Sequence, residues 1–171
     1  FRRFCGFSSS EPVPERTAFV RFRRELVARG LDERLFAAVL RQIEARGLVV
    51  RTGTLVDATV VKQAASTDGE AAWCVYAGPH RTPSKGYKAH VATDEDGGIV
   101  RRIAVTPANV HDASGLPLVL PARPGRVWAD SAYDNQAIHD EVRARGGQPR
   151  IARRLRKGMA PAKAAARRAW N

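Results

Sequence analysis

The chain has 171 residues, a formal net charge of +12 and a hydrophobic fraction of 44%. This length suits one domain with a sizeable core plus a short extra segment, and the balance of apolar and charged residues is that of a soluble globular protein rather than a disordered one. No apolar stretch approaches the roughly 20 residues of a membrane span and no signal peptide is visible, so we expect a cytoplasmic protein with no membrane partner.

The positive charge is concentrated at the two ends of the chain. Residues 1–56 carry a net charge of +5 and residues 142–171 one of +10, whereas residues 57–141 carry −3. Basic surfaces of this size usually face a polyanion, most often nucleic acid. The alternative is a solvated, arginine-rich surface without such a partner.

Two short amphipathic helices are predicted near the N-terminus. Residues 15–29 and 32–46 carry apolar side chains at helical spacing. Gly30 and Gly47 are plausible stop signals, and Asp32 is a plausible N-cap for the second helix. The pair fits either a helix-turn-helix-like DNA reader or two helices that pack against other parts of the protein.

The first strand is predicted over residues 53–61, GTLVDATVV. Its apolar side chains alternate onto both faces, as in a central strand that is covered on both sides. Asp57 lies inside this run. A buried carboxylate is costly unless it is paired, hydrogen-bonded or bound to a metal, so Asp57 is a candidate functional residue.

The rest of the chain is predicted to alternate between strands and helices, an order typical of an α/β sheet. The expected elements are a long loop over 65–85, a hairpin of strands over 86–93 and 99–106, a helix over 113–120, a strand over 126–130, a helix over 135–145, a strand over 149–152 and a helical tail from about residue 160.

A second aspartate, Asp130, ends the strand that follows the hairpin. Strands distant in sequence can be neighbours in an α/β sheet, so Asp57 and Asp130 can converge at one edge. Their mutual repulsion is then offset by a cation, and carboxylate oxygens favour Mg²⁺ or Mn²⁺. Such ions support phosphodiester chemistry. The alternative is two separate carboxylates, one at a strand end and one bonded to backbone.

Several longer motifs point to one protein family. GTLVDAT, GYKAHVATD, TPANVHDA and ADSAYD occur in this order, after the upstream stretch PERTAFVRFRREL. Together they resemble the bacterial insertion-sequence transposases that carry a DDE catalytic triad on a ribonuclease-H-like fold. The resemblance implies a mixed α/β sheet flanked by helices over residues 51–171, preceded by a helical segment over residues 1–50.

The resemblance also implies an activity. In this family, a metal-activated water cleaves the transposon end and the freed 3′-hydroxyl attacks target DNA. Asp57 and Asp130 match the first two catalytic carboxylates, which would bind Mg²⁺ or Mn²⁺. The third, a glutamate, lies in the family on a helix after the basic segment. No acidic residue follows Glu141 here, so we expect that glutamate to fall beyond Asn171 and this chain to be an incomplete catalytic core.

The partners implied by the resemblance are transposon ends, target DNA and further copies of the same chain, because these enzymes pair two DNA ends. The implied location is the bacterial cytoplasm, in association with the nucleoid. The acidic triad being incomplete, a catalytically inactive DNA-binding remnant is an alternative. A basic RNA-binding protein is a third reading, but it needs exposed aromatic residues for base stacking, and only 7% of the residues are aromatic.

Five other residues are candidates for supporting the site. Tyr133 matches the family's tyrosine and either lies beside the carboxylates, touches a phosphate or simply packs. His111 and Asp112 either steady the site as a pair or cap the next helix. Lys88 and His90 share one face of a strand, where they either contact a phosphate or face solvent.

The densest positive run is PRIARRLRKG, and no acidic residue in the sequence is near enough to neutralise it. We interpret its basic side chains as contacts to the DNA backbone, which position a duplex without reading its sequence. These residues are Arg150, Arg153, Arg154, Arg156 and Lys157.

Overall fold

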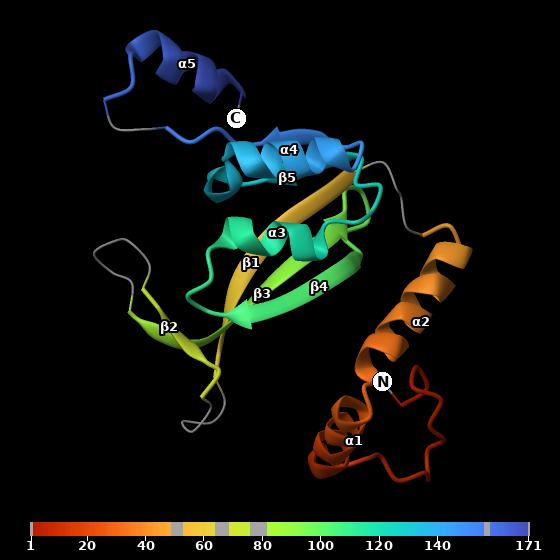
Figure 1. Cartoon of the computed structure of the whole chain (residues 1–171). Coiled ribbons are helices and arrows are strands. Elements are labelled where there is room, and N and C mark those ends of the chain that lie inside the picture. Colours follow the sequence, from red (N-terminus) through yellow and green to blue (C-terminus); the bar gives the residue numbers. More distant parts are fainter. Residues whose placement is uncertain (1, 49–52, 64–68, 76–81, 156–157, 171) are drawn as a thin grey trace. The chain divides into compact units, whose positions relative to one another are not determined.

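A computed structural model of the chain divides into two compact units, residues 1–47 and 48–171. It describes residues 2–48, 53–63, 69–75, 82–155 and 158–170 (Figure 1). The boundary predicted after residue 50 lies outside the described residues. In the described part of the chain, no helix has the length and apolar character needed to cross a membrane.

The first unit contains the two predicted helices, α1 (Arg16–Ala28) and α2 (Asp32–Ala45). Gly30 and Gly47 follow them with φ values of 59° and 69°, a left-handed conformation that favours glycine and ends a helix. Both predicted stop signals are therefore confirmed.

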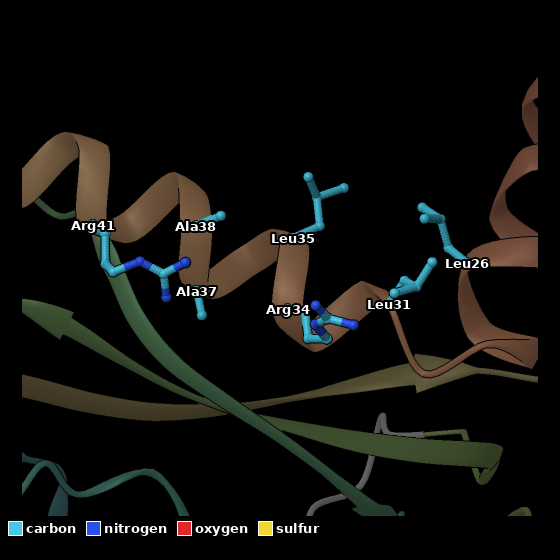
Figure 2. A pocket seen from close by; sticks show the side chains of 7 residues that line it. All are labelled: Leu26, Leu31, Arg34, Leu35, Ala37, Ala38 and Arg41. Atoms are coloured by element: carbon cyan, nitrogen blue, oxygen red, sulfur yellow. The ribbon is translucent and has the colours of Figure 1, made fainter.

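The prediction that Asp32 caps α2 is wrong. The N-cap is Leu31, which offers no side-chain acceptor, and Asp32 is the first helical residue. Its negative charge there still complements the positive end of the helix dipole. Figure 2 shows the hollow where the two helices meet, with Leu26 of α1 and Leu31 facing each other across the turn. Its lining also includes Arg34, Leu35, Ala37, Ala38 and Arg41.

The second unit is built on a mixed sheet. Strands β1 and β3 pair antiparallel, whereas β1, β5 and β6 run parallel to one another; both β2 and β4 pair antiparallel with β3. This arrangement confirms the predicted α/β class and the predicted mixed sheet. The strands are β1 (Gly53–Lys62), β2 (Ala72–Cys74), β3 (Ser84–Asp94), β4 (Val100–Pro107), β5 (Arg126–Ala129) and β6 (Gln148–Ile151).

Helices α3 (Asp112–Val119) and α4 (Gln136–Ala144) lie over one face of this sheet (Figure 1). A short 3₁₀ turn, η1 (Ser131–Tyr133), joins β5 to α4, and a last helix, α5 (Pro161–Trp170), follows β6. The hydrophobic core fills the space between the helices and the sheet. Its buried members are Val56, Ala92, Ala113, Leu116, Val119, Leu120, Val127, Tyr133, Ile138, Val142 and Ile151.

The opposite face of the sheet, here called the open face, exposes apolar side chains. The prediction that the first strand is covered on both sides is therefore wrong for the described residues: Val56 is buried, but Leu55 and Val61 are 40% and 52% exposed. The reason is that α3 and α4 cover the same side. The open face also carries Ile103, Val105 and Trp128, which the strand registers place on the side of Leu55.

One further difference concerns the predicted loop over residues 65–85. A short strand, β2, lies within it, and β3 already begins at Ser84. The apolar triplet Ala72–Cys74 pairs with residues 84–86 at the start of β3. This short segment forms a strand because the long β3 strand offers it main-chain hydrogen-bond partners. Residues 64–68 and 76–81 lie outside the described part of the chain.

Candidate active site

The sheet register brings the two predicted aspartates together. Strands β1 and β5 are parallel neighbours in which Leu55 pairs with Trp128. Two residues further along come Asp57, still within β1, and Asp130, directly after the end of β5. Continued by two residues, the same register would set them alongside each other. Residues paired across a ladder project to the same face. This placement supports the convergence that the sequence predicts.

Both carboxylates are exposed, so the expectation of a buried Asp57 is wrong. The open face leaves this side of β1 uncovered, and the charge does not have to be desolvated. Each carboxylate is held by a nearby main-chain amide. The Oδ1 atom of Asp57 accepts from the amide of Ala58 at 2.8 Å, and that of Asp130 accepts from the amide of Ala132 at 2.9 Å, which caps η1.

Tyr133 follows Asp130 by three residues and has its ring in the hydrophobic core. The residue is 1% exposed, and its hydroxyl has no hydrogen-bond partner among the described residues. Burial raises the pKa of this hydroxyl, and the negative charges of Asp112, Asp57 and Asp130 raise it further. Packing in the core explains the position of the ring, but it does not explain why a buried hydroxyl is present there.

His111 and Asp112 separate into two different roles. His111 is the N-cap of α3, and its Nδ1 atom accepts from the amide of Ala113 at 3.2 Å. The Asp112 carboxylate instead forms an ion pair with the ammonium of Lys88, with 2.6 Å between Oδ1 and Nζ. The two residues do not form a mutual pair, and the capping interpretation holds for His111.

Lys88 and His90 share one face of β3, but that face is the covered one. They are 7% and 0% exposed, so the alternative that they face solvent is wrong. The Lys88 ammonium also donates to the carbonyl of Val110 at 2.6 Å. With α3 above them, neither side chain is available to a DNA phosphate in this structure.

His90 is enclosed by sheet and helix. Its Nε2 atom is 2.9 Å from the hydroxyl oxygen of Thr106, and its Nδ1 atom has no partner among the described residues. The ring packs against the backbone of Gly115, where a Cβ atom would lie 2.1 Å from Nδ1. Burial lowers the pKa of His90, as does the charge of Lys88, while Asp112 opposes them. The imidazole is thus a neutral core group.

The basic segment, residues 150–157, is partly neutralised. Sequence reasoning found no acidic neighbour, but Asp134 contacts Arg153 through an ion pair of 3.1 Å and the main-chain amide of Arg154 at 2.9 Å. The signal was present in the motif ADSAYD, whose last residue is Asp134, yet its partners lie about twenty residues away. Arg150 is exposed on β6, and the predicted Arg156 and Lys157 lie outside the described residues.

The acidic side chains can be tested against the needs of a metal ion. Among the residues described, no three His, Cys, Asp or Glu side chains lie close enough to hold one. The pair formed by Asp57 and Asp130 still fits Mg²⁺, which often takes one or two carboxylates and fills its other positions with water and substrate phosphate. The exposure of both carboxylates and the unpartnered hydroxyl of Tyr133 are consistent with oxygen ligands at this place.

The chain is similar to a known protein family and to a solved structure. The family model described as "Transposase DDE domain" matches residues 49–169, a span that includes every strand of the sheet. The chain is also similar to a solved chain described as "Mos1 transposase paired-end complex with left transposon end", with 14% identity and a TM-score of 0.36. That match covers 66% of this chain and 38% of the solved chain, so the present sequence spans less than half of that protein.

Proposed function

This chain belongs to the transposase DDE domain family, and we propose that it acts in the metal-dependent cleavage and transfer of DNA strands at the ends of an insertion sequence. The observation that supports the proposal is the parallel pairing of β1 with β5, whose register, continued by two residues, would set Asp57 alongside Asp130 within the matched span. The distance in sequence between these two residues is large, so their juxtaposition is a property of the fold.

The chemistry would be shared between the ion and the residues around it. Asp57 and Asp130 would hold Mg²⁺ or Mn²⁺, which when bound activates the attacking oxygen and stabilises the leaving one. The amides of Ala58 and Ala132 fix one oxygen of each carboxylate, which limits the rotation of both side chains. The raised pKa of Tyr133 keeps its hydroxyl protonated at neutral pH, so it can donate a hydrogen bond to a carboxylate.

DNA would be held by the basic C-terminal part of the chain. Residues 142–171 carry ten basic side chains and no acidic one. Each phosphate contact releases counterions, so we expect the affinity for duplex DNA to fall steeply as salt rises from 50 to 200 mM. A flat salt response would contradict this part of the proposal. Pairing of two transposon ends would require further copies of the chain.

A catalytically inactive, DNA-binding relative is the second candidate. It is favoured by the lack, in the part of the chain that the structure describes, of a third acidic side chain close to Asp57 and Asp130. Both candidates bind DNA, so metal binding is the property that separates them.

The test is calorimetric titration of Mg²⁺ and Mn²⁺ into the parent chain and into the isosteric variants Asp57→Asn and Asp130→Asn. Loss of binding in both variants would support one shared site. Asp140→Asn is the matched control, because Asp140 is an exposed acidic residue on α4 that pairs with Gln136 and Arg143 on the same helix. Binding that is unchanged in both test variants would refute the shared site, and no binding to the parent chain would favour the inactive candidate.

A further inference from the structure

Asp134 lies next to the candidate site but is not one of its proposed metal ligands. It directly follows η1, the turn that Asp130 caps, and its carboxylate is only 9% exposed. The turn itself is held by main-chain bonds, from the amide of Tyr133 to the carbonyl of Asp130 and from the amide of Asp134 to the carbonyl of Ser131. The position of Asp134 relative to Asp130 is therefore fixed.

The carboxylate of Asp134 binds three groups from two other elements. Its Oδ1 atom accepts from Nε2 of His139, on α4, and from the guanidinium of Arg153, each at 3.1 Å. Its Oδ2 atom accepts from the main-chain amide of Arg154 at 2.9 Å. Burial alone would raise the pKa of Asp134, but these three donors outweigh it and hold the pKa below its usual value. The carboxylate is thus charged and well satisfied.

The bond to the Arg154 amide matters because it fixes main chain rather than a long side chain. Strand β6 ends at Ile151, and the amide of Ala152 still continues the ladder by bonding to the carbonyl of Ala129. Beyond Ala152, the hydrogen bond from the Arg154 amide to Asp134 holds the main chain in place. The guanidinium of Arg154 adds a contact to the carbonyl of Ser131 at 3.3 Å, so two residues of the basic segment are attached to the turn that carries Asp130.

From this geometry we propose that Asp134 is a positioning residue, which fixes the start of the basic segment beside the carboxylate of Asp130 so that DNA held by the segment lies at the site. The proposal rests on the proposed function for its DNA-binding part. Its structural part, the attachment of Arg153 and Arg154 to η1, can be tested without DNA.

The structural part is tested by limited digestion with trypsin, followed by mass spectrometry of the bonds after Arg153 and Arg154. We expect Asp134→Ala to speed cleavage at these two bonds by roughly tenfold or more, since cleavage reports local opening of the backbone. Asp134→Asn keeps an oxygen that can accept from the Arg154 amide, so it should give a smaller increase. Cleavage at the parent rate in Asp134→Ala would overturn the proposal.

Asp140→Ala is the matched control, because it removes an equal charge from the same region but from an exposed side chain. Its cleavage rate at Arg153 and Arg154 should equal that of the parent. An equal increase in this control would show that charge alone loosens the segment, and this result would also overturn the proposal.

The functional part is tested by DNA affinity, where the sign of the change is decisive. Removing an acidic residue from a DNA-binding surface should strengthen binding, and we expect a slight gain in Asp140→Ala. If Asp134 only neutralised Arg153, Asp134→Ala would show the same gain. A positioning role predicts instead that Asp134→Ala loses DNA affinity by roughly three- to tenfold and that Asp134→Asn restores part of it. Thermal stability and Mg²⁺ binding are measured for the same variants.

A gain in DNA affinity for Asp134→Ala would therefore overturn the positioning role. If Asp134→Ala fails to fold, the same comparison is made with Asp134→Asn against Asp140→Asn. Failure of the parent chain to bind DNA would refute the proposed function, while the trypsin experiment would still decide whether Asp134 fixes the segment.

Discussion

Gly115 is a position at which one added methyl group should have a large effect. It lies inside α3, where alanine is favoured over glycine by about 1 kcal/mol through helix propensity alone. Its φ angle is not positive, so alanine meets no backbone strain. By local reasoning, Gly115→Ala should therefore stabilise the protein.

The packing around Gly115 predicts the opposite sign. A Cβ atom there would lie 2.1 Å from Nδ1, 2.2 Å from Cε1 and 2.4 Å from Cγ of His90, which is fully buried and tied to Thr106 at 2.9 Å. Overpacking of a well-filled core costs typically 1–3 kcal/mol, and contacts this short belong at the upper end. After subtraction of the helix term, we expect a net loss of about 2 kcal/mol in the free energy of unfolding.

Urea denaturation followed by circular dichroism measures this loss, and a double-mutant cycle identifies its cause. In a His90→Ala background the ring is gone, so the same Gly115→Ala change should become neutral or stabilising by up to about 1 kcal/mol. Ser114→Ala, at an exposed neighbour in the same helix, should have little effect. Equal stability of Gly115→Ala and the parent, or an equal loss with and without the His90 ring, would refute the reasoning.

Two further predictions concern the covered face of β3. The pKa of His90 is lowered in the folded state, whereas an unfolded histidine has a pKa of about 6.5. The unfolded state therefore binds the proton first, and stability should fall as the pH drops below about 6.5, by at most about 1.4 kcal/mol per pH unit. Urea curves between pH 7.5 and 5.5 should show this slope in the parent and a smaller one in His90→Gln; an identical slope would contradict the assignment. Lys88→Met should cost roughly 2–4 kcal/mol, less than for a fully buried pair because the Asp112 side chain is 31% exposed. Most of that loss should return in Lys88→Met/Asp112→Asn, and a single variant as stable as the parent would show that the ion pair contributes nothing.

The sequence contained enough information for most of the order of elements and for the hypothesis that the two aspartates converge. Helices and strands follow local periodicity and glycine stops, as at Gly30 and Gly47. That hypothesis used the fact that strands distant in sequence can be neighbours in an α/β sheet. The structure shows that β1 and β5 are such neighbours and gives their register.

What could not be predicted depends on which face of the sheet the helices cover. Lys88 and His90 alternate correctly along their strand, but alternation does not say which side is buried. The side was decided by α3, whose residues pair with Lys88 through Asp112 and pack on His90 through Gly115. The role of Asp134 was hidden for a similar reason, because its partners are distant in sequence and one of them is a main-chain amide.

The open face of the sheet also shapes how unfolding responds to conditions. Leu55, Val61 and Trp128 are already partly in contact with water in the folded unit, so its unfolding exposes less new apolar surface than the unfolding of a sheet covered on both faces would. Both the heat capacity of unfolding and the denaturant m value scale with that surface. Residues 48–171 should therefore have a shallow stability curve and a small m value. Because a midpoint shift equals the change in free energy divided by m, each substitution in this unit should move its urea midpoint further than the same change would in a fully covered domain.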